Sequence, residues 1–104
     1  MTYSIELSPR TQRQLEAMPK NVREELSPII SSLADNPRPP GVRSVKELDK
    51  CYRLRHRDYR IVYAVHDKVL LVLVLAVANR REVYSRHEIA AIRRELRRRL
   101  RREE

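Results

Sequence analysis

The sequence predicts a small single domain of the α+β class: an N-terminal strand, two helices, then a mainly antiparallel sheet and a C-terminal helix. Three observations lead to this prediction. Apolar residues alternate at the N-terminus, they recur at helical intervals over residues 8–33, and three strand-like runs follow between residues 51 and 78. The 104 residues suit one hydrophobic core, so we treat residues 1–104 as one domain.

The first strand and the first helix have clear sequence signatures. Over residues 3–7, Tyr, Ile and Leu alternate with Ser and Glu, which is typical of a half-buried strand. Ser8 is a good helix cap, and Pro9 suits the first helical position after it. Pro19 should end this short helix, because proline lacks the N–H group that a continuing helix needs.

A second amphipathic helix is expected from the apolar residues between Val22 and Leu33, which recur at helical intervals. Asn21 and Glu24 have the spacing of a capping box at its start. Pro28 lies inside this helix and removes one backbone hydrogen bond. We therefore expect a kink or an early break at Pro28.

The second half of the chain predicts the sheet. Residues 35–41 contain three prolines and the only glycine, so they form a stiff connection that no helix continues. A short strand is expected near residues 44–48, and better strands at 51–55 and 59–66. The unbroken apolar run at 69–78 predicts a central strand covered on both faces. It has about half the length of a membrane helix, so we predict no membrane span.

The last segment predicts a basic helix. From residue 85 onward, Ile89, Ile92, Leu96 and Leu100 mark a narrow apolar stripe among many arginines. Like charges at such spacing weaken an isolated helix. We therefore expect the helix over 85–104 to fray, or to become ordered only against the sheet or a partner.

Composition favours an anionic partner. Lys and Arg total 23 against 14 Asp and Glu, which gives a net charge of +9 and favours nucleic acid or another polyanion. Most of the excess is arginine, whose planar guanidinium binds phosphate through two parallel hydrogen bonds. The single cysteine excludes an internal disulfide and a cysteine-based zinc site, and it suits a reducing compartment. We predict a cytoplasmic protein.

Two neighbouring strands are expected to place arginines on one face. Successive strand residues point to opposite faces, so Arg53 and Arg55 project together if Tyr52 and Leu54 pack inward. Arg60 would join them from the next strand. Three guanidinium groups repel one another unless an anion lies among them, which is typical of a phosphate-binding surface. A solvated charged face is the alternative interpretation.

Three short blocks resemble the RelE branch of the RelE/ParE toxins of bacterial toxin–antitoxin pairs: CYRLR at 51–55, DYRIVY at 58–63 and NRREVY at 79–84. They follow one another at near-family spacing. The resemblance implies a RelE-like fold similar to microbial ribonucleases, and a ribosome-dependent endonuclease that cuts mRNA in the A site. In that family the 2′-hydroxyl attacks the adjacent phosphate to leave a cyclic phosphate, without metal or other cofactor. The implied partners are the ribosome with its mRNA and a cognate acidic antitoxin.

The resemblance also assigns roles to residues of this chain. The catalytic candidates are Arg60, Arg80 and Tyr84, and the RNA-binding candidates are Arg53, Arg55, Arg57 and Arg81. Arg53 and Arg55 stand where the family often has lysines. A free tyrosine has a pKa of about 10, so Tyr84 needs neighbouring positive charge to act as the base. Arg80 suits the leaving-group side, and Arg81 could take its place.

Two other functions stay open at this point. A ParE-like toxin would act on DNA gyrase by protein binding and have no nuclease site, and the presence of Arg80 and Tyr84 argues against it. A plain RNA-binding module would need exposed aromatic rings for stacking on bases. Tyr52, Tyr59 and Tyr63 instead have the strand parity of packing residues.

Histidine or cysteine chemistry is not favoured. His56 and His66 fall at expected turns and His87 begins the last helix, so the three share no evident face for acid and base catalysis. Cys51 has no partner at a suggestive spacing, and we expect it to be a small buried residue.

Overall fold

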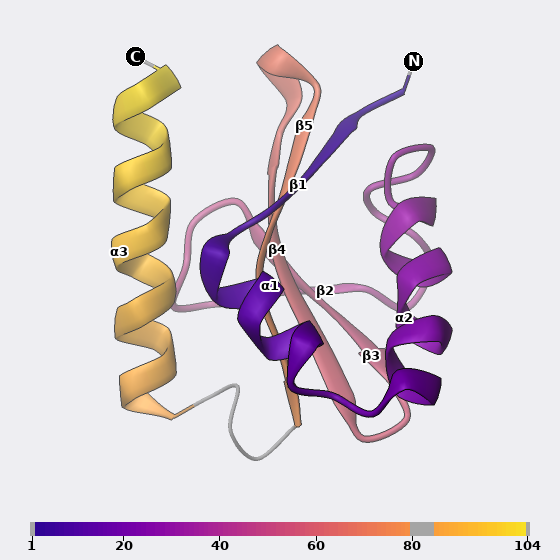
Figure 1. The fold of residues 1–104 in the computed structure, drawn as a ribbon. Helices are drawn as coiled ribbons and strands as arrows, with labels where there is room; N and C mark the ends of the chain where they lie inside the picture. Colours follow the sequence, from indigo (N-terminus) through magenta and orange to yellow (C-terminus); the bar gives the residue numbers. More distant parts are fainter. Residues whose placement is uncertain (1, 80–84, 104) are drawn as a thin grey trace.

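The computed structural model describes residues 2–79 and 85–103, with side chains as far as residue 99 in the last helix (Figure 1). In chain order the elements are β1 (Ser4–Leu7), α1 (Pro9–Glu16), α2 (Lys20–Ser32), β2 (Arg43–Ser44), β3 (Cys51–His56), β4 (Tyr59–His66), a 3₁₀ turn η1 (Asp67–Val69), β5 (Leu71–Asn79) and α3 (Arg86–Glu103). This order confirms the predicted α+β class.

The strands form one five-stranded sheet in the order β1-β5-β4-β3-β2. β1 runs parallel to β5, whereas the other three pairs are antiparallel, so the prediction of a mainly antiparallel sheet is confirmed. α2 packs on one face of the sheet and α3 on the other (Figure 1). β5 lies between β1 and β4, and its residues 71–78 are buried, as the unbroken apolar run predicts.

The two faces of the sheet contribute to two separate cores, because alternate residues of a strand point in opposite directions. Ile61 and Tyr63 pack toward α2, together with Leu26 and Ile30 of that helix. Val62 and Ala64 of β4 pack on the other face toward α3, where Ile92 and Leu96 meet the sheet. The sheet is therefore covered on both sides.

α1 begins as predicted. Ser8 is its N-cap, the Ser8 Oγ accepts a hydrogen bond of 3.1 Å from the Thr11 N–H, and Pro9 occupies the first helical position. The same helix protects the edge of β5 beyond the end of β1. The Thr11 hydroxyl donates to the Val74 carbonyl at 2.9 Å, and Gln14 Oε1 accepts from the Val77 N–H at 2.8 Å. Gln14 thus takes the place of a strand partner beyond the end of β1, while Thr11 strengthens the last paired position, Val74.

The predicted start of α2 is wrong, and of the two outcomes expected at Pro28 the early break does not occur. The helix follows directly on Pro19 as its N-cap, so Asn21 and Glu24 do not form a capping box at its start. The helix also continues through Pro28 to Ser32 instead of breaking. Pro28 and Glu24 are both exposed, so water can hydrate the carbonyl group that proline leaves without a donor. Burial of the apolar side of α2 outweighs this loss.

The boundaries of two strands also differ from expectation. β2 comprises only Arg43–Ser44, because the chain turns directly afterwards, with the Leu48 N–H donating to the Val45 carbonyl. The central strand starts at Leu71 instead of residue 69, because Leu70 has a positive φ of 51° that no strand accommodates. α3 packs against the sheet through Ile89, Ile92 and Leu96 of the expected stripe, and Ile92 is fully buried. The side chain of Leu100, the fourth member, lies outside the described residues.

Candidate active site: an arginine pocket on the sheet

The strand register gathers four arginines at one end of the sheet. Arg55 lies opposite Arg60 across the β3–β4 pair, and Arg43 lies opposite Arg53 across the β2–β3 pair. These four side chains and Gly41 line a small pocket of about 140 Å³, which we call the arginine pocket. The expectation that Arg53, Arg55 and Arg60 converge is confirmed in its geometry.

Arg60 is the deepest of these cations, because its relative exposure is only 9%. Its Nη1 donates to the Tyr59 carbonyl at 3.4 Å, which leaves most of the five N–H groups of the guanidinium available to a ligand. A buried cation attracts an anion more strongly than an exposed one, because less water screens the pair. The pocket therefore has the charge and the size to hold a phosphate group.

Gly41 forms the wall of the pocket for a conformational reason. Its φ is +89°, a backbone conformation that L-residues with a side chain rarely adopt. A Cβ at this position would meet no atom within 4 Å, so space is not the constraint. The glycine instead allows the connection from α2 to turn into β2 beside Arg43.

The connection before Gly41 is held by an ion-pair cluster that the sequence did not reveal. Arg38 donates from both Nη atoms to Asp67, at 3.2 and 2.8 Å, and from Nε to the Tyr52 hydroxyl at 3.0 Å. Hydrogen bonding to Arg38, and then to Tyr3, lowers the pKa of Asp67 to about 2. This cluster fixes residues 35–41 against the sheet.

The end of β5 lies next to the arginine pocket. Ala78 pairs with Arg60, and Asn79 pairs with Tyr59. The segment that carries Arg80, Arg81 and Tyr84 follows Asn79 directly in the sequence. These three candidate residues lie outside the described residues, so their roles stay predictions.

Arg57 is not brought to the arginine pocket. It occupies the β3–β4 turn with a φ of 55°, and its side chain is 74% exposed. Its Nε lies 2.8 Å from Glu25 Oε1 of α2, which also pairs with His56 Nε2 at 2.8 Å. Hydrogen bonding to His56 is the main cause of a lowered pKa for Glu25. In this structure Arg57 joins the turn to α2 on the opposite face of the sheet.

Tyrosines of the sheet serve packing, as their strand parity predicts. Tyr63 is fully buried, its hydroxyl donates to the Pro37 carbonyl at 2.7 Å, and burial raises the pKa of its phenol. Tyr52 and Tyr59 are half-buried against the same core. Among the described residues, the lining of the arginine pocket includes no tyrosine.

In the described residues, the cysteine and the histidines do not come together as a catalytic centre. Cys51 is buried as expected, and desolvation raises its pKa to about 12, so the thiol stays protonated at neutral pH. The three histidines lie apart, at the end of β3, at the end of β4 and in α3. Within residues 2–79 and 85–103, no group of three or more His, Cys, Asp or Glu could hold a metal ion.

Arg43 and Gly41 are the pocket residues that sequence reasoning missed. The predicted strand at 44–48 began one residue after Arg43, so its pairing with Arg53 was not foreseen. A glycine after two prolines was a signal of an unusual turn, but the position of that turn beside the arginine pocket depends on the sheet.

No helix in the described part of the chain is long and apolar enough to cross a membrane.

Comparison with known proteins gives a family and a set of relatives. The family model described as the ParE toxin of the type II toxin–antitoxin system parDE matches residues 5–84. The mRNA interferase toxin RelE of Escherichia coli K12 is 29% identical over 89 residues, which cover 82% of this chain and 93% of that protein.

Solved structures of RelE proteins have the same fold. A doubly substituted variant of E. coli RelE in the free state aligns with a TM-score of 0.72 and 24% identity, covering 90% of this chain and 98% of that chain. The toxin chain of the intact E. coli RelBE toxin–antitoxin complex aligns with a TM-score of 0.66 and 25% identity, covering 74% and 95%. The family model matches most of the chain, and the sheet and helices have the fold of the solved RelE structures, so this protein belongs to the RelE/ParE family of type II toxin–antitoxin toxins.

Proposed function

We propose that this toxin is an endoribonuclease that cuts mRNA in the A site of the ribosome. The arginine pocket is the observation that carries the proposal, because it concentrates four guanidinium groups beside the end of β5. The E. coli relative at 29% identity is named an mRNA interferase, which supports the same activity. Such a toxin acts where ribosomes are, in the cytoplasm.

The reaction we propose is an intramolecular transesterification of the RNA phosphodiester. The 2′-oxygen forms a bond to phosphorus while the bond from phosphorus to the 5′-oxygen breaks, which leaves a 2′,3′-cyclic phosphate and a free 5′-hydroxyl. Tyr84 takes the proton of the 2′-hydroxyl, while Arg80 or Arg81 stabilises the negative charge on the departing 5′-oxygen, which takes its proton from water. Arg60, Arg55 and Arg53 stabilise the negative charge that grows on the phosphorane. Arg43 adds a fourth cation to that set.

We also propose that an acidic antitoxin protein silences the toxin. E. coli RelE has been solved in complex with its antitoxin RelB. The net charge of +9 favours rapid association with a protein of opposite charge. A reading frame for a small acidic protein beside the toxin gene would be the first support.

The test is cleavage of a defined message on programmed ribosomes. We expect the toxin to break the message within the A-site codon, and Arg60→Ala and Tyr84→Phe each to reduce the cleavage rate by about 10²-fold or more. Arg13→Ala is the matched control, because Arg13 is an exposed arginine of α1 that does not line the arginine pocket, so this variant should stay within about twofold of wild type. Cleavage that survives both site changes in folded protein would reject the site.

Action on DNA gyrase is the second candidate, because the matching family model is described as a ParE toxin. The same purified protein should then inhibit supercoiling of plasmid DNA by gyrase and leave the message intact. Message cleavage without an effect on supercoiling excludes this candidate.

A further inference from the structure

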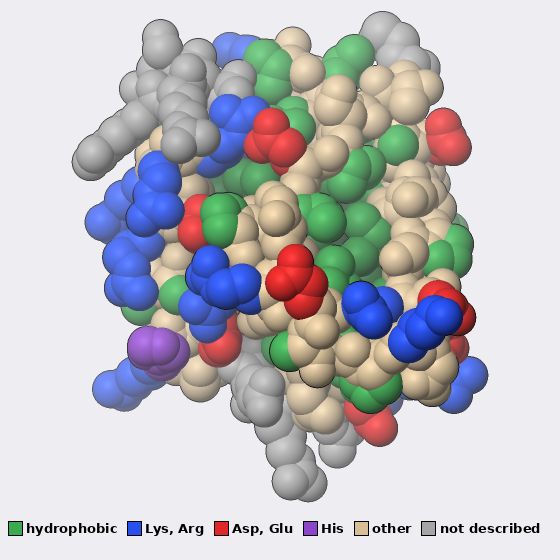
Figure 2. All heavy atoms as spheres, viewed as in Figure 1, with side chains coloured by type: hydrophobic (Ala, Val, Ile, Leu, Met, Phe, Trp, Pro, Cys, Tyr) green, Lys and Arg blue, Asp and Glu red, His purple; other side chains and the backbone are tan. Residues whose placement is uncertain are grey.

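The outward side of α3 is a continuous cationic surface. At about 100° per residue, its exposed arginines fall within an arc of roughly 140° on the side opposite the apolar stripe. At one margin of this arc the Arg93 Nη2 donates to the Glu47 carbonyl at 2.8 Å. The five members, which we call the α3 arginine ladder, are Arg86, Arg93, Arg94, Arg97 and Arg98. Figure 2 shows Lys and Arg side chains gathered along the side of the molecule that α3 forms.

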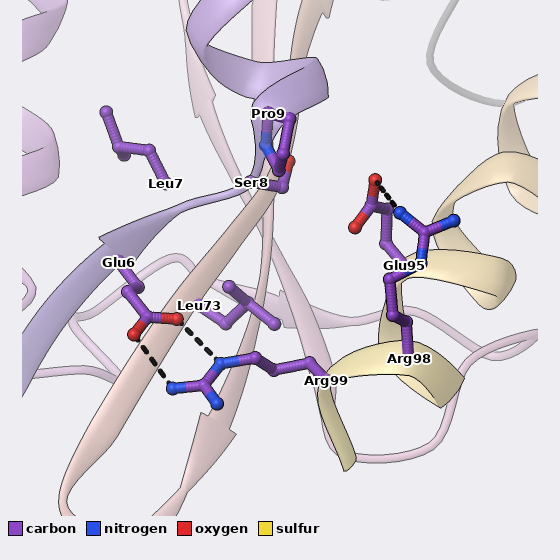
Figure 3. A pocket seen from close by; sticks show the side chains of 8 residues that line it. All are labelled: Glu6, Leu7, Ser8, Pro9, Leu73, Glu95, Arg98 and Arg99. Atoms are coloured by element: carbon purple, nitrogen blue, oxygen red, sulfur yellow. Dashed lines mark hydrogen bonds and ion pairs between the residues drawn. The ribbon is translucent and has the colours of Figure 1, made fainter. Parts of the chain in front are cut away.

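The acidic residues of α3 do not neutralise this ladder. Glu88 points inward and forms an ion pair with Arg10 of α1. On the inner flank, Arg99 makes two hydrogen bonds to Glu6 of β1, at 2.7 and 2.8 Å (Figure 3). Arg98 lies 3.7 Å from Glu95 but is 62% exposed, so water screens that pair strongly. The inner cation is thus paired with a carboxylate, while the outer surface keeps its positive charge.

The ladder carries an energetic cost in the free protein. Arg94 has a like charge three and four residues further along the helix, and such pairs each destabilise a helix by about 0.2–0.5 kcal/mol. A row of phosphate groups would remove this repulsion. The surface is therefore better suited to a bound polyanion than to water.

We propose that the α3 arginine ladder is a second RNA-binding surface, which docks on the phosphate backbone of ribosomal RNA while the arginine pocket holds the message. This inference rests on the proposed action at the ribosome. The ladder extends for about 18 Å along the helix, so it spans many phosphate groups of a structured RNA. The arginine pocket is a separate and compact site of about 140 Å³, which none of the ladder residues lines.

RNA suits this surface better than an acidic protein does. Protein interfaces are anchored by buried aromatic and aliphatic side chains. In the described part of the chain, Val69 is the only large exposed apolar residue, and it lies in η1 instead of α3. All five members of the ladder are arginines, whose guanidinium groups bind phosphate with two parallel hydrogen bonds.

The test compares two triple variants on vacant bacterial ribosomes and on a labelled RNA hairpin. The first, R94Q/R97Q/R98Q, removes three ladder cations and keeps good helix formers. The matched control, R13Q/K20Q/K68Q, removes three exposed cations from other surfaces. We expect the ladder variant to bind at least about tenfold more weakly at 0.1 M salt, and its plot of log affinity against log salt to become shallower by about 2 to 3. The control should keep most of the wild-type slope and affinity.

A charge-retaining variant distinguishes electrostatics from misfolding. R94K/R97K/R98K should restore most of the salt slope, and circular dichroism should report equal helix content in all three variants. If the Gln variant loses helix, single R97Q applies the same test with an expected slope change of about 1. Equal ribosome affinity for the ladder variant and the control overturns the inference. Polyglutamate is a further probe, which stands for an acidic protein. A ladder variant that loses binding to polyglutamate but not to RNA also overturns the inference, because the surface would then serve an acidic protein.

The two proposals fail in different ways. Binding to vacant ribosomes needs no cleavage, so a toxin that cuts no message but shows the ladder effect rejects the proposed reaction and keeps the docking surface. A toxin that cuts its message and binds equally well without the ladder keeps the reaction and rejects the docking surface. At saturating ribosomes the ladder variant should cleave at the wild-type rate, because the ladder touches no reacting atom.

Discussion

At the scale of single residues, the site depends on where each arginine meets its nearest carboxylate. Arg57 reaches Glu25 and is held on the α2 side of the sheet, although its place in the sequence suggests that it accompanies Arg55. Arg38 is held by Asp67 in the same way and fixes the connection to Gly41. Arg60 instead lies buried among other arginines of the pocket. Residue type alone does not separate these roles.

The ion pair of Asp67 should be visible in the acid stability of the protein. Its pKa is lowered to about 2 in the folded chain, so the pair contributes stability above the unfolded value of 3.8 and loses it as the pH falls toward 2. Asp67→Asn should therefore lower stability above about pH 4, and most of the difference from wild type should be lost as the pH falls to about 2. Urea unfolding at a series of pH values measures this. Asp35→Asn, which removes an exposed charge near the start of the same connection, is the control, and a difference that persists undiminished at pH 2 would contradict the assignment.

At the scale of elements, α1 does more than cover the sheet. Its Gln14 side chain accepts from the Val77 N–H, beyond the point at which β1 stops pairing with β5, and Thr11 adds a second donor to the Val74 carbonyl, which also accepts from the Ser8 N–H. β5 leads directly to the arginine pocket, so the helix also supports the strand that ends there. An amphipathic pattern predicts that such a helix packs on the sheet, but not that its Gln14 takes the place of a strand partner.

Two glutamines of α1 provide a matched test of this role. Gln14→Ala leaves the partly buried Val77 N–H without its acceptor, and we expect a loss of about 1–3 kcal/mol in the free energy of unfolding. Gln12→Ala removes an exposed hydrogen bond to the Leu7 carbonyl, which water can replace, so the loss should be below about 0.5 kcal/mol. Equilibrium denaturation compares the two. Equal losses would show that α1 does not support the β5 edge in this way.

At the scale of the whole molecule, the sheet separates two cores, and α3 supplies the helical side of one of them. Its arginines would favour fraying, but burial of Ile92 and Leu96 and the ion pair of Arg99 with Glu6 fasten it to the sheet. The ion pair of Glu88 with Arg10 fastens it to α1. The helix thereby presents its cationic side outward next to the face that holds the arginine pocket. Of the alternatives expected for this segment, the structure has the one in which the helix is ordered against the sheet.

Two isoleucines of α3 test how firmly the helix belongs to the domain. Ile92 is fully buried, so Ile92→Ala should reduce the free energy of unfolding by roughly 2–4 kcal/mol through lost packing and a cavity. Ile89 is only partly buried, and Ile89→Ala should cost about half as much or less. Denaturation followed by circular dichroism gives both values. A negligible effect of Ile92→Ala would mean that α3 does not stabilise the sheet.

The sequence by itself determined the elements whose signals are local. Alternation predicted β1, and strand-like runs between turns predicted β3 and β4. Ser8-Pro9 predicted the start of α1, the apolar run predicted a buried β5, and the blocks at 51–55, 58–63 and 79–84 predicted the family. Only the tertiary structure decided that Arg43 and Gly41 complete the arginine pocket, that Arg57 turns to α2, and that α2 continues through Pro28. These outcomes depend on sheet order, on register and on burial energy between segments distant in the chain, and no local pattern encodes such contacts.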